Sequence, residues 1–369
     1  MSEAALLREF RLPRQEILQL LQLVGPTLAR ETRRSYPLSP EIQLLAALRY
    51  YAVGSFLEVV GDGYGLSKTS VWRCVEAVTN LLGHANDYIR LPSTRQEIME
   101  VHQGFYAIAG IPRVIGLVDG TLIPIANQSM RDQAFISRKG YAAINVQVVV
   151  DSMGVFLDLV ARWPGSTHDS FVWANSVVGQ HAEQGIFGQS LFLGDSGYPL
   201  RTYLFTPVAN PTTQAERAYN TAHIRTRCVV ERTIGVWRFR CIHRSAGGLR
   251  LQPQRCCAVL VVTAMLHNIA VRGGQLHLLR PPPGEDGLHP LPSRRRALRD
   301  GDPGQHCPAG GRRVPRVLHQ GRDPGVPFGR DLGVLHKPQE NPDVDRVASI
   351  LLKPASPGSL LGWEDSLGR

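Results

Sequence analysis

The stretch that decides the fold of this chain is IGLVDGT, residues 115–121, which places a single carboxylate, Asp119, inside an apolar segment. The pattern over 114–125 predicts a β-strand, because apolar and β-branched residues dominate it. Burying a charged side chain among apolar neighbours is costly unless a counter-charge or a metal ion faces it. The stretch therefore predicts a buried strand that carries a polar site.

The elements that follow this stretch predict an α/β core. Residues 142–151 and 155–161 form two further predicted strands joined by a turn at 152–154, which gives an antiparallel set of three. The elements predicted after this set are a helix at 169–181, a strand at 190–194 and helices at 227–240 and 253–271. Three strands followed by helix, strand and helix are typical of an α/β fold with a covered sheet.

Residues 1–110 show the spacing of helices instead. The predicted helices are an amphipathic one at 17–24, one that starts at Ser39-Pro40, one that follows a glycine turn at 61–63 and one at 96–108. The third of these has the features of a helix-turn-helix segment, in which Ser67 is the cap and Lys68 and Arg73 lie exposed near the helix start. Packing of three helices without DNA explains the same pattern, so both interpretations stay open.

Residues 272–369 differ in composition from the rest of the chain. They contain 15 Gly and 14 Pro among 98 residues, and they lack an apolar period. Such a segment buries too little apolar surface to offset its ordering entropy, which predicts a disordered tail. Its arginine pairs fit a solvated linker or a nucleic-acid or nuclear-import tail. The predicted domains are therefore a helical region, 1–110, an α/β domain, 111–271, and a tail, 272–369.

The charge of the chain favours a polyanionic partner. Its 369 residues include 41 Lys and Arg against 31 Asp and Glu, a formal charge of +10, and nearly all of the cations are arginine, which suits phosphate recognition. Six cysteines without a CxxC pair argue against a zinc module and a disulfide scaffold. With no secretory signal and no apolar run of 18 residues, we expect an intracellular protein without a membrane span.

Three further acids stand where chains of this class place ligand sites. Asp195 follows the apolar run at 190–194, Glu231 lies near the packed face of a predicted helix, and Asp169 opens another helix. Carboxylates gathered in one place repel each other unless cations lie between them. Hard oxygen ligands suit Mg²⁺ or Mn²⁺, and two such ions can support phosphoryl transfer. Asp169 has a simpler explanation, since a carboxylate at a helix start is favoured by the helix dipole.

An ordered set of motifs, rather than any single motif, resembles the DDE-superfamily transposases of the PIF/Harbinger group. The resemblance covers about 18–271, and its motifs are VDGT at 118–121, RKG at 138–140, NVQ at 145–147, WPGSTHD at 163–169, LGDSGY at 193–198, VERT at 230–233 and LHN at 266–268.

The resemblance implies a fold and a set of site residues. The fold is RNase H-like, and the catalytic acids are Asp119 on the first strand, Asp195 after the fourth strand and Glu231 on a later helix. Asp169 belongs to a family motif and is a candidate supporting metal ligand. The implied cofactor is Mg²⁺ or Mn²⁺.

The implied substrate is DNA, and the implied partner is a Myb/SANT-like DNA-binding protein. The residues expected to contact DNA are Lys68, Arg73, Lys139, Arg225, Arg227, Arg232 and Arg238. The resemblance also implies residence in the nucleus and the cytoplasm.

The chain departs from the family at two positions. Leu122 stands where the family commonly has a histidine three residues after the first acid, and Ala142 stands where a second histidine often occurs. Two hypotheses therefore stay open. The first is a metal-dependent DNA endonuclease, which the retention of all three acids favours, and the second is a non-catalytic DNA-binding or adaptor protein, which the two departures favour.

Overall fold

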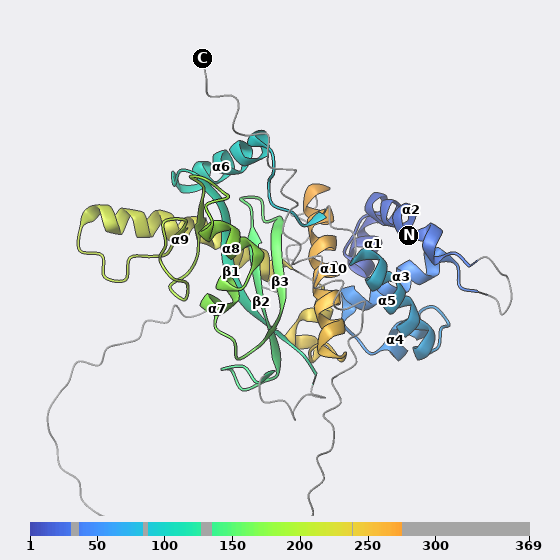
Figure 1. Cartoon of the computed structure of the whole chain (residues 1–369). Coiled ribbons are helices and arrows are strands. Elements are labelled where there is room, and N and C mark those ends of the chain that lie inside the picture. Colours follow the sequence, from blue (N-terminus) through green and yellow to red (C-terminus); the bar gives the residue numbers. More distant parts are fainter. Residues whose placement is uncertain (31–36, 84–87, 127–134, 238, 275–369) are drawn as a thin grey trace, which may run out of the picture. The chain divides into compact units, whose positions relative to one another are not determined.

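The strand β1, Val114–Pro124, is the central member of a five-stranded sheet in the computed structural model of the chain (Figure 1). The structure describes residues 1–30, 37–83, 88–126, 135–237 and 239–274. The other strands are β2 (Ala143–Val150), β3 (Phe156–Pro164), β4 (Leu191–Leu193) and β5 (Leu204–Phe205). Their order in the sheet is β3-β2-β1-β4-β5. The first three strands are antiparallel, whereas β4 and β5 run parallel to β1, so the sheet is mixed.

Helices precede the sheet and lie between its later strands. The N-terminal helices are α1 (Glu3–Phe10), α2 (Arg14–Leu28), α3 (Pro40–Val53), α4 (Leu57–Asp62), α5 (Lys68–Leu82) and α6 (Arg95–Ala109). The later helices are α7 (Asp169–Ala174), α8 (Val177–Glu183), α9 (Gln214–Val236) and α10 (Pro253–Arg272), with 3-10 turns η3 (Arg240–Ile242) and η4 (Arg244–Ala246) before α10.

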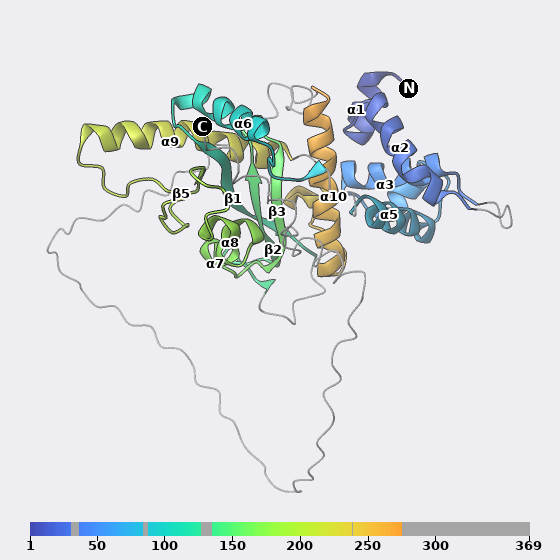
Figure 2. The ribbon, with the colours of Figure 1, turned by 45° about the horizontal axis from the view of Figure 1, so that its top comes forward.

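The two faces of the sheet are covered by different helices. Leu117 and Val148 share a face and join one apolar cluster with residues of α9 and α10. Val118 and Val149, on the opposite face, join a second cluster with α7 and α8 (Figure 2). Because side chains alternate along a strand, two consecutive residues of β1 face two different helix layers. A covered α/β sheet is what the sequence predicts.

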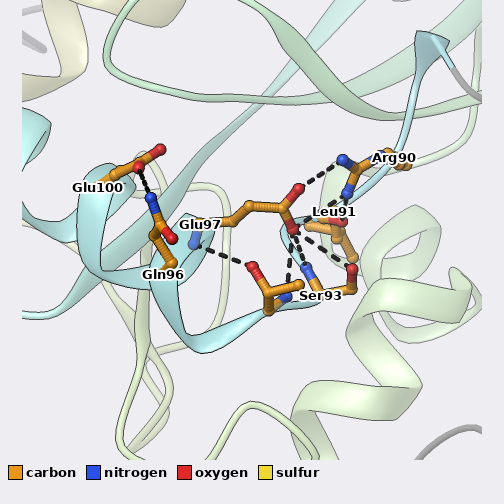
Figure 3. Close-up of polar contacts among 7 residues, drawn as sticks. Arg90, Leu91, Ser93, Gln96, Glu97 and Glu100 are labelled. Carbon is orange, nitrogen blue, oxygen red and sulfur yellow. Dashed lines mark hydrogen bonds and ion pairs between the residues drawn. The ribbon is translucent and has the colours of Figure 1, made fainter.

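The start of α6 is fixed by a single carboxylate, Glu97 (Figure 3). Thr94 and Glu97 form a capping box, and Glu97 also accepts hydrogen bonds from the Ser93 amide at 2.8 Å and from the Arg90 guanidinium at 2.5 Å. These bonds hold the pKa of Glu97 well below its usual range, with the Arg90 hydrogen bond the largest cause. These bonds fix the N-terminus of α6. The helix packs on β1.

The N-terminal region contacts the sheet through α6 and also contacts α10. Arg255 of α10 forms an ion pair with Glu76 of α5 at 2.8 Å, and Asn268 Nδ2 donates to the Tyr88 carbonyl at 2.7 Å. By length and composition α10 could cross a membrane, but 72% of that window is buried in the structure, as in the core helix of a globular protein. The domain boundaries at 1–110, 111–271 and 272–369 stay predictions, and residues 275–369 lie outside the described residues.

Several predicted boundaries are wrong. The helix expected at 169–181 is split into α7 and α8, because Ser176 accepts from the Gly179 amide at 2.9 Å and starts a new helix. The glycine turn expected at 61–63 starts inside α4, and the helix expected at 227–240 begins at Gln214 and ends at Val236. The two-residue strand β5 is missing from the prediction, since Leu204–Phe205 is too short to show a period.

Candidate active site

Asp119 lies on β1 just beyond the end of its parallel neighbour. The last residue of β4, Leu193, pairs with Leu117, so β1 continues past β4 toward Asp119. Asp119 shares a face with Leu117, which is the face that α9 covers. Its side chain is 17% exposed, and its Oδ1 accepts a hydrogen bond from the Gly120 amide at 3.0 Å. The acid predicted on this strand is therefore present, and it is half-buried.

One guanidinium, that of Arg227 on α9, joins two of the predicted catalytic acids. Arg227 Nη2 lies 3.2 Å from Asp119 Oδ2, and Nη1 lies 3.5 Å from Glu231 Oε1. Arg227 and Glu231 are one turn apart, so they share a side of the helix. The Arg227 side chain is 13% exposed and that of Glu231 is 56% exposed. The contact thus runs from the buried strand to the surface of the helix.

Asp195 and Asp169 reach the same region from two other elements. Asp195 follows β4, and its Oδ1 accepts from the Gly197 amide at 2.9 Å. A Cβ atom placed on Gly197 would lie 3.0 Å from Asp195 Oδ1 and 3.9 Å from Asp169 Oδ2, so both carboxylates lie beside this glycine. The geometry therefore brings Asp169 and Asp195 together.

Asp169, the first residue of α7, is held against β1 and β2. Asn145 Nδ2 donates to Asp169 Oδ1 at 3.0 Å and to the Thr167 carbonyl at 2.8 Å. A Cβ atom on Gly120 would collide with Asp169 Oδ1, so the glycine after Asp119 makes room for this second acid. Because Gly120 and Asn145 lie on the α7 face, Asp169 approaches from the side of the sheet opposite to Glu231.

The charges in this cluster perturb each other. Burial is the largest cause that raises the pKa of Asp119 to about 7; Asp195 and Glu231 also raise it, while Arg227 and the Gly120 amide oppose them. An acid with a pKa near neutrality, sitting beside other acids and a cation, is typical of a functional site. Structural ion pairs perturb pKa values too, so the convergence of four acids carries the assignment.

The Tyr198 hydroxyl is a neighbour of this cluster that was not predicted from the sequence. Tyr198 is buried, and among the described residues its hydroxyl has no hydrogen-bond partner. Burial, followed by Asp169, Asp119 and Asp195, raises its pKa well above the ordinary value. A buried tyrosine hydroxyl usually has a partner. The available signal was its place in the LGDSGY motif, three residues after Asp195.

The donor set suits a hard divalent cation, since every candidate ligand is a carboxylate oxygen. Within the described ranges, however, no group of three or more His, Cys, Asp or Glu is arranged as a metal-holding cluster. The cation that lies against Asp119 and Glu231 in this structure is the Arg227 guanidinium. The carboxylates are therefore suitable ligands for a divalent cation, but in this structure Asp119 and Glu231 are paired with Arg227.

The helix-turn-helix candidate, α5, is an ordinary capped and packed helix. The Ser67 hydroxyl accepts from the Ser70 amide at 3.2 Å, and Val71, Val75 and Val78 are buried. Lys68 and Arg73 are exposed as expected, and Lys68 Nζ lies 3.2 Å from Glu58 of α4. Ser70 is half-buried. These contacts agree with both interpretations of the helix.

The other predicted DNA contacts are distributed over two segments. Lys139 is exposed in the segment before β2, and Arg225 and Arg232 are exposed on α9. Arg232 Nε donates to the Cys228 carbonyl at 3.2 Å. Arg227 differs from them because its guanidinium is turned inward to the acids, and Arg238 lies outside the described residues.

Comparison with known proteins identifies the family. Residues 118–268 match the family described as DDE superfamily endonuclease. The human protein named "Putative nuclease HARBI1" is 38% identical over 272 residues, which cover 73% of this chain and 78% of that protein. Its Xenopus laevis namesake is 34% identical over 270 residues, 72% of this chain and 78% of that protein. The Arabidopsis thaliana "Protein ALP1-like" is 28% identical over 257 residues, 64% of this chain and 61% of that protein. No solved structure matches the chain.

A mixed α/β fold with an acid cluster at the end of its central strands fits the endonucleases of the DDE superfamily, and the chain belongs to this transposase-derived nuclease family. Within the superfamily, its relatives are the Harbinger transposase-derived nucleases. The resemblance to PIF/Harbinger transposases is therefore confirmed, and so is the prediction of a nuclease.

Proposed function

We propose that this chain is a divalent-metal-dependent DNA endonuclease that hydrolyses phosphodiester bonds with Asp119, Asp195 and Glu231. The observation that carries the proposal is the meeting of acids from β1, from the segment after β4 and from α9 in one charged cluster. These three elements are distant in sequence, and acids have no packing reason to gather. A shared cation-dependent task explains why they do.

The sheet topology supports an RNase H-like core. The first acid lies on the first strand, the second follows the fourth strand, and the glutamate lies on a later helix. This is the order that the family resemblance implies. The parallel pairing of β1 with β4 brings the first two acids to the same end of the sheet.

We assign each of the four acids a role in metal binding from its burial and its position. Asp119 and Asp195 would hold one cation, and Glu231 would complete a second site with its exposed carboxylate. Asp169, fixed by Asn145, would act as a supporting ligand. A bound divalent cation supplies Lewis acidity and activates water for attack on the phosphodiester. Gly120 and Gly197 leave the space that the acids need to approach one another.

Exposed basic residues would hold the DNA backbone. Lys139, Arg225 and Arg232 are accessible, and Arg238, which lies outside the described residues, belongs to the same predicted set. Arg227 is turned toward the acids and is left out of this role. Lys68 and Arg73 on α5 would contact a groove or phosphates. We extend the proposal, on the family resemblance, to a Myb/SANT-like partner and to residence in the nucleus and the cytoplasm.

The test is cleavage of supercoiled plasmid DNA by the full chain with Mg²⁺ or Mn²⁺. We expect metal-dependent nicking that EDTA stops and that the triple variant D119A/D195A/E231A lacks. Asp158→Asn is the matched control, because Asp158 is an acid on the same sheet, on β3, whose pKa burial raises to about 6. Cleavage that survives in the triple variant would contradict the assignment.

A second candidate is a non-catalytic DNA-binding adaptor. It is favoured by Leu122, which pairs with Asn145 beside Asp169, and by Ala142, since both positions commonly hold histidine in the family. Wild-type protein that binds DNA but never cleaves it with either metal would select this function.

A further inference from the structure

Arg227 is among the residues expected to contact DNA, but its surroundings in the structure indicate a different role. Its two terminal nitrogens are shared between Asp119 Oδ2 at 3.2 Å and Glu231 Oε1 at 3.5 Å. Its Nε is buried, and among the described residues it has no hydrogen-bond partner. A guanidinium held with one donor unpaired must be retained by its attraction to the carboxylates.

The position of Arg227 follows from secondary structure. Arg227 and Glu231 are separated by one turn of α9, and α9 packs on β1. That packing brings the start of the turn to Asp119 on the strand. Arg225, two residues earlier, lies on a different side of the helix and is exposed. The inward place of Arg227 is therefore set by helix phase and not by its charge.

Arg227 offsets part of the negative charge of the acid cluster. Asp195 and Glu231 raise the pKa of Asp119, and Arg227 is the largest influence that lowers it. Without a cation, these carboxylates repel one another. A guanidinium that contacts two of them at once replaces part of what a divalent ion would provide.

We propose that Arg227 is a built-in cation that occupies the acid cluster when no divalent ion is bound, and that a divalent ion binds by displacing it. The inference rests on the proposed metal-dependent function. Asp119 Oδ2 and Glu231 Oε1 already point to a cation, so they cannot serve a metal ion fully until the guanidinium withdraws. Arg227 is thus a positioning residue that keeps the acids together and lowers their affinity for metal.

The experiment is calorimetric titration of the full chain with MnCl₂ alone, without DNA. We expect Arg227→Gln to bind Mn²⁺ about tenfold more tightly than wild type, equal to about 1.4 kcal/mol. Arg227→Lys, which retains the charge but cannot fork between two carboxylates, should fall between them. The control is Arg217→Gln on the same helix, because Arg217 donates to the Pro211 and Thr212 carbonyls and not to the acids. The Mn²⁺ affinity of this variant should equal that of wild type.

A second readout separates this role from simple structural support. In EDTA, Arg227→Gln should melt at a lower temperature than wild type, and saturating Mn²⁺ should narrow or reverse the difference. If Arg227→Gln does not fold, the Arg227→Lys comparison decides by the same criteria. Equal or weaker Mn²⁺ binding by the folded variant overturns the inference.

The outcomes also distinguish failure of this inference from failure of the proposed function. In one outcome, the wild type binds Mn²⁺, Asp119→Asn does not, and Arg227→Gln binds no more tightly than the wild type. This outcome supports the metal site but contradicts the role of Arg227. Absence of Mn²⁺ binding in wild type and in every variant overturns the metal-dependent function, and this inference with it.

Discussion

The acid cluster on the sheet and the helix α5 differ in how well local rules explain them. In α5, a serine cap, buried valines, and ion pairs of Lys68 with Glu58 and of Glu76 with Arg255 are ordinary capping and packing contacts. In the cluster, Asp119 is an ionisable, half-buried residue, and its pKa is raised to about 7. Arg227 Nε and the Tyr198 hydroxyl have no hydrogen-bond partner in the described part of the chain, and a side chain at position 120 would collide with Asp169. Functional sites are where local consistency is broken, so the cluster is the stronger functional candidate.

Substituting an acid of the cluster should have the strongest effect of all, a loss of DNA cleavage. Asp119→Asn or Asp195→Asn should reduce metal-dependent plasmid cleavage to background, because each removes a charged metal ligand. DNA affinity, measured by fluorescence anisotropy, should stay within about twofold of wild type, since the acids do not attract phosphate. Asp158→Asn should cleave normally, and equal losses in all three variants would indicate a general folding defect.

The pH dependence of stability gives the next largest effect. The folded pKa of Asp119, about 7, lies above its ordinary value of 3.8, so wild type loses stability as pH rises from about 4 to about 7. Asp119→Asn removes this loss and should be about 2–4 kcal/mol more stable than wild type at pH 8 in EDTA, but about equal at pH 4. Urea unfolding at the two pH values measures the difference.

Asp158 provides the comparison for that measurement. Its pKa, raised by burial to about 6, predicts the same sign with a smaller gain for Asp158→Asn. An Asp119→Asn variant that is less stable than wild type at both pH values would mean that its hydrogen bond and ion pair outweigh its burial.

A smaller effect tests whether α5 has more than a packing role. Substituting Lys68 and Arg73 together with alanine should weaken DNA binding and lower the slope of log affinity against log salt by about 2, if both contact phosphates. The melting temperature should hardly change, since both side chains are exposed and the Lys68–Glu58 pair contributes little. Arg95→Ala, an exposed arginine of α6, is the control. An unchanged slope would leave α5 as packing alone.

Removing the N-cap side chain of α5 or of α9 should have the smallest effect, a modest loss of stability. Ser67→Ala at α5 and Thr213→Ala at α9 should each cost about 1 kcal/mol of stability, because each removes the acceptor for a backbone amide of the first turn. Neither should alter metal binding, since Arg227 lies several turns beyond Thr213. A change in Mn²⁺ affinity in Thr213→Ala alone would show that the start of α9 controls the position of Arg227.

The sequence predicted most elements where a period or a cap was strong. The strand at 114–125 agrees with β1 to within one residue, and Ser39-Pro40 marks the start of α3. The first half of α9 was missed because Gln214–His223 is polar on most sides and shows little apolar period. The break between α7 and α8 depends on one serine, and propensity alone does not distinguish a cap from a mid-helix serine.

The sequence by itself determined which residues carry charge in an apolar setting: Asp119 in its strand, Asp195 after a short strand and Glu231 on a packed helix. Only the tertiary structure decided that Arg227 faces Asp119 and Glu231, and that Asp169 reaches the cluster from the opposite face across Gly120. The physical reason is that burial and period are local properties of the chain. Ion pairing depends on how α9 and α7 are placed over two faces of one sheet, and that placement is set by packing among residues far apart in sequence.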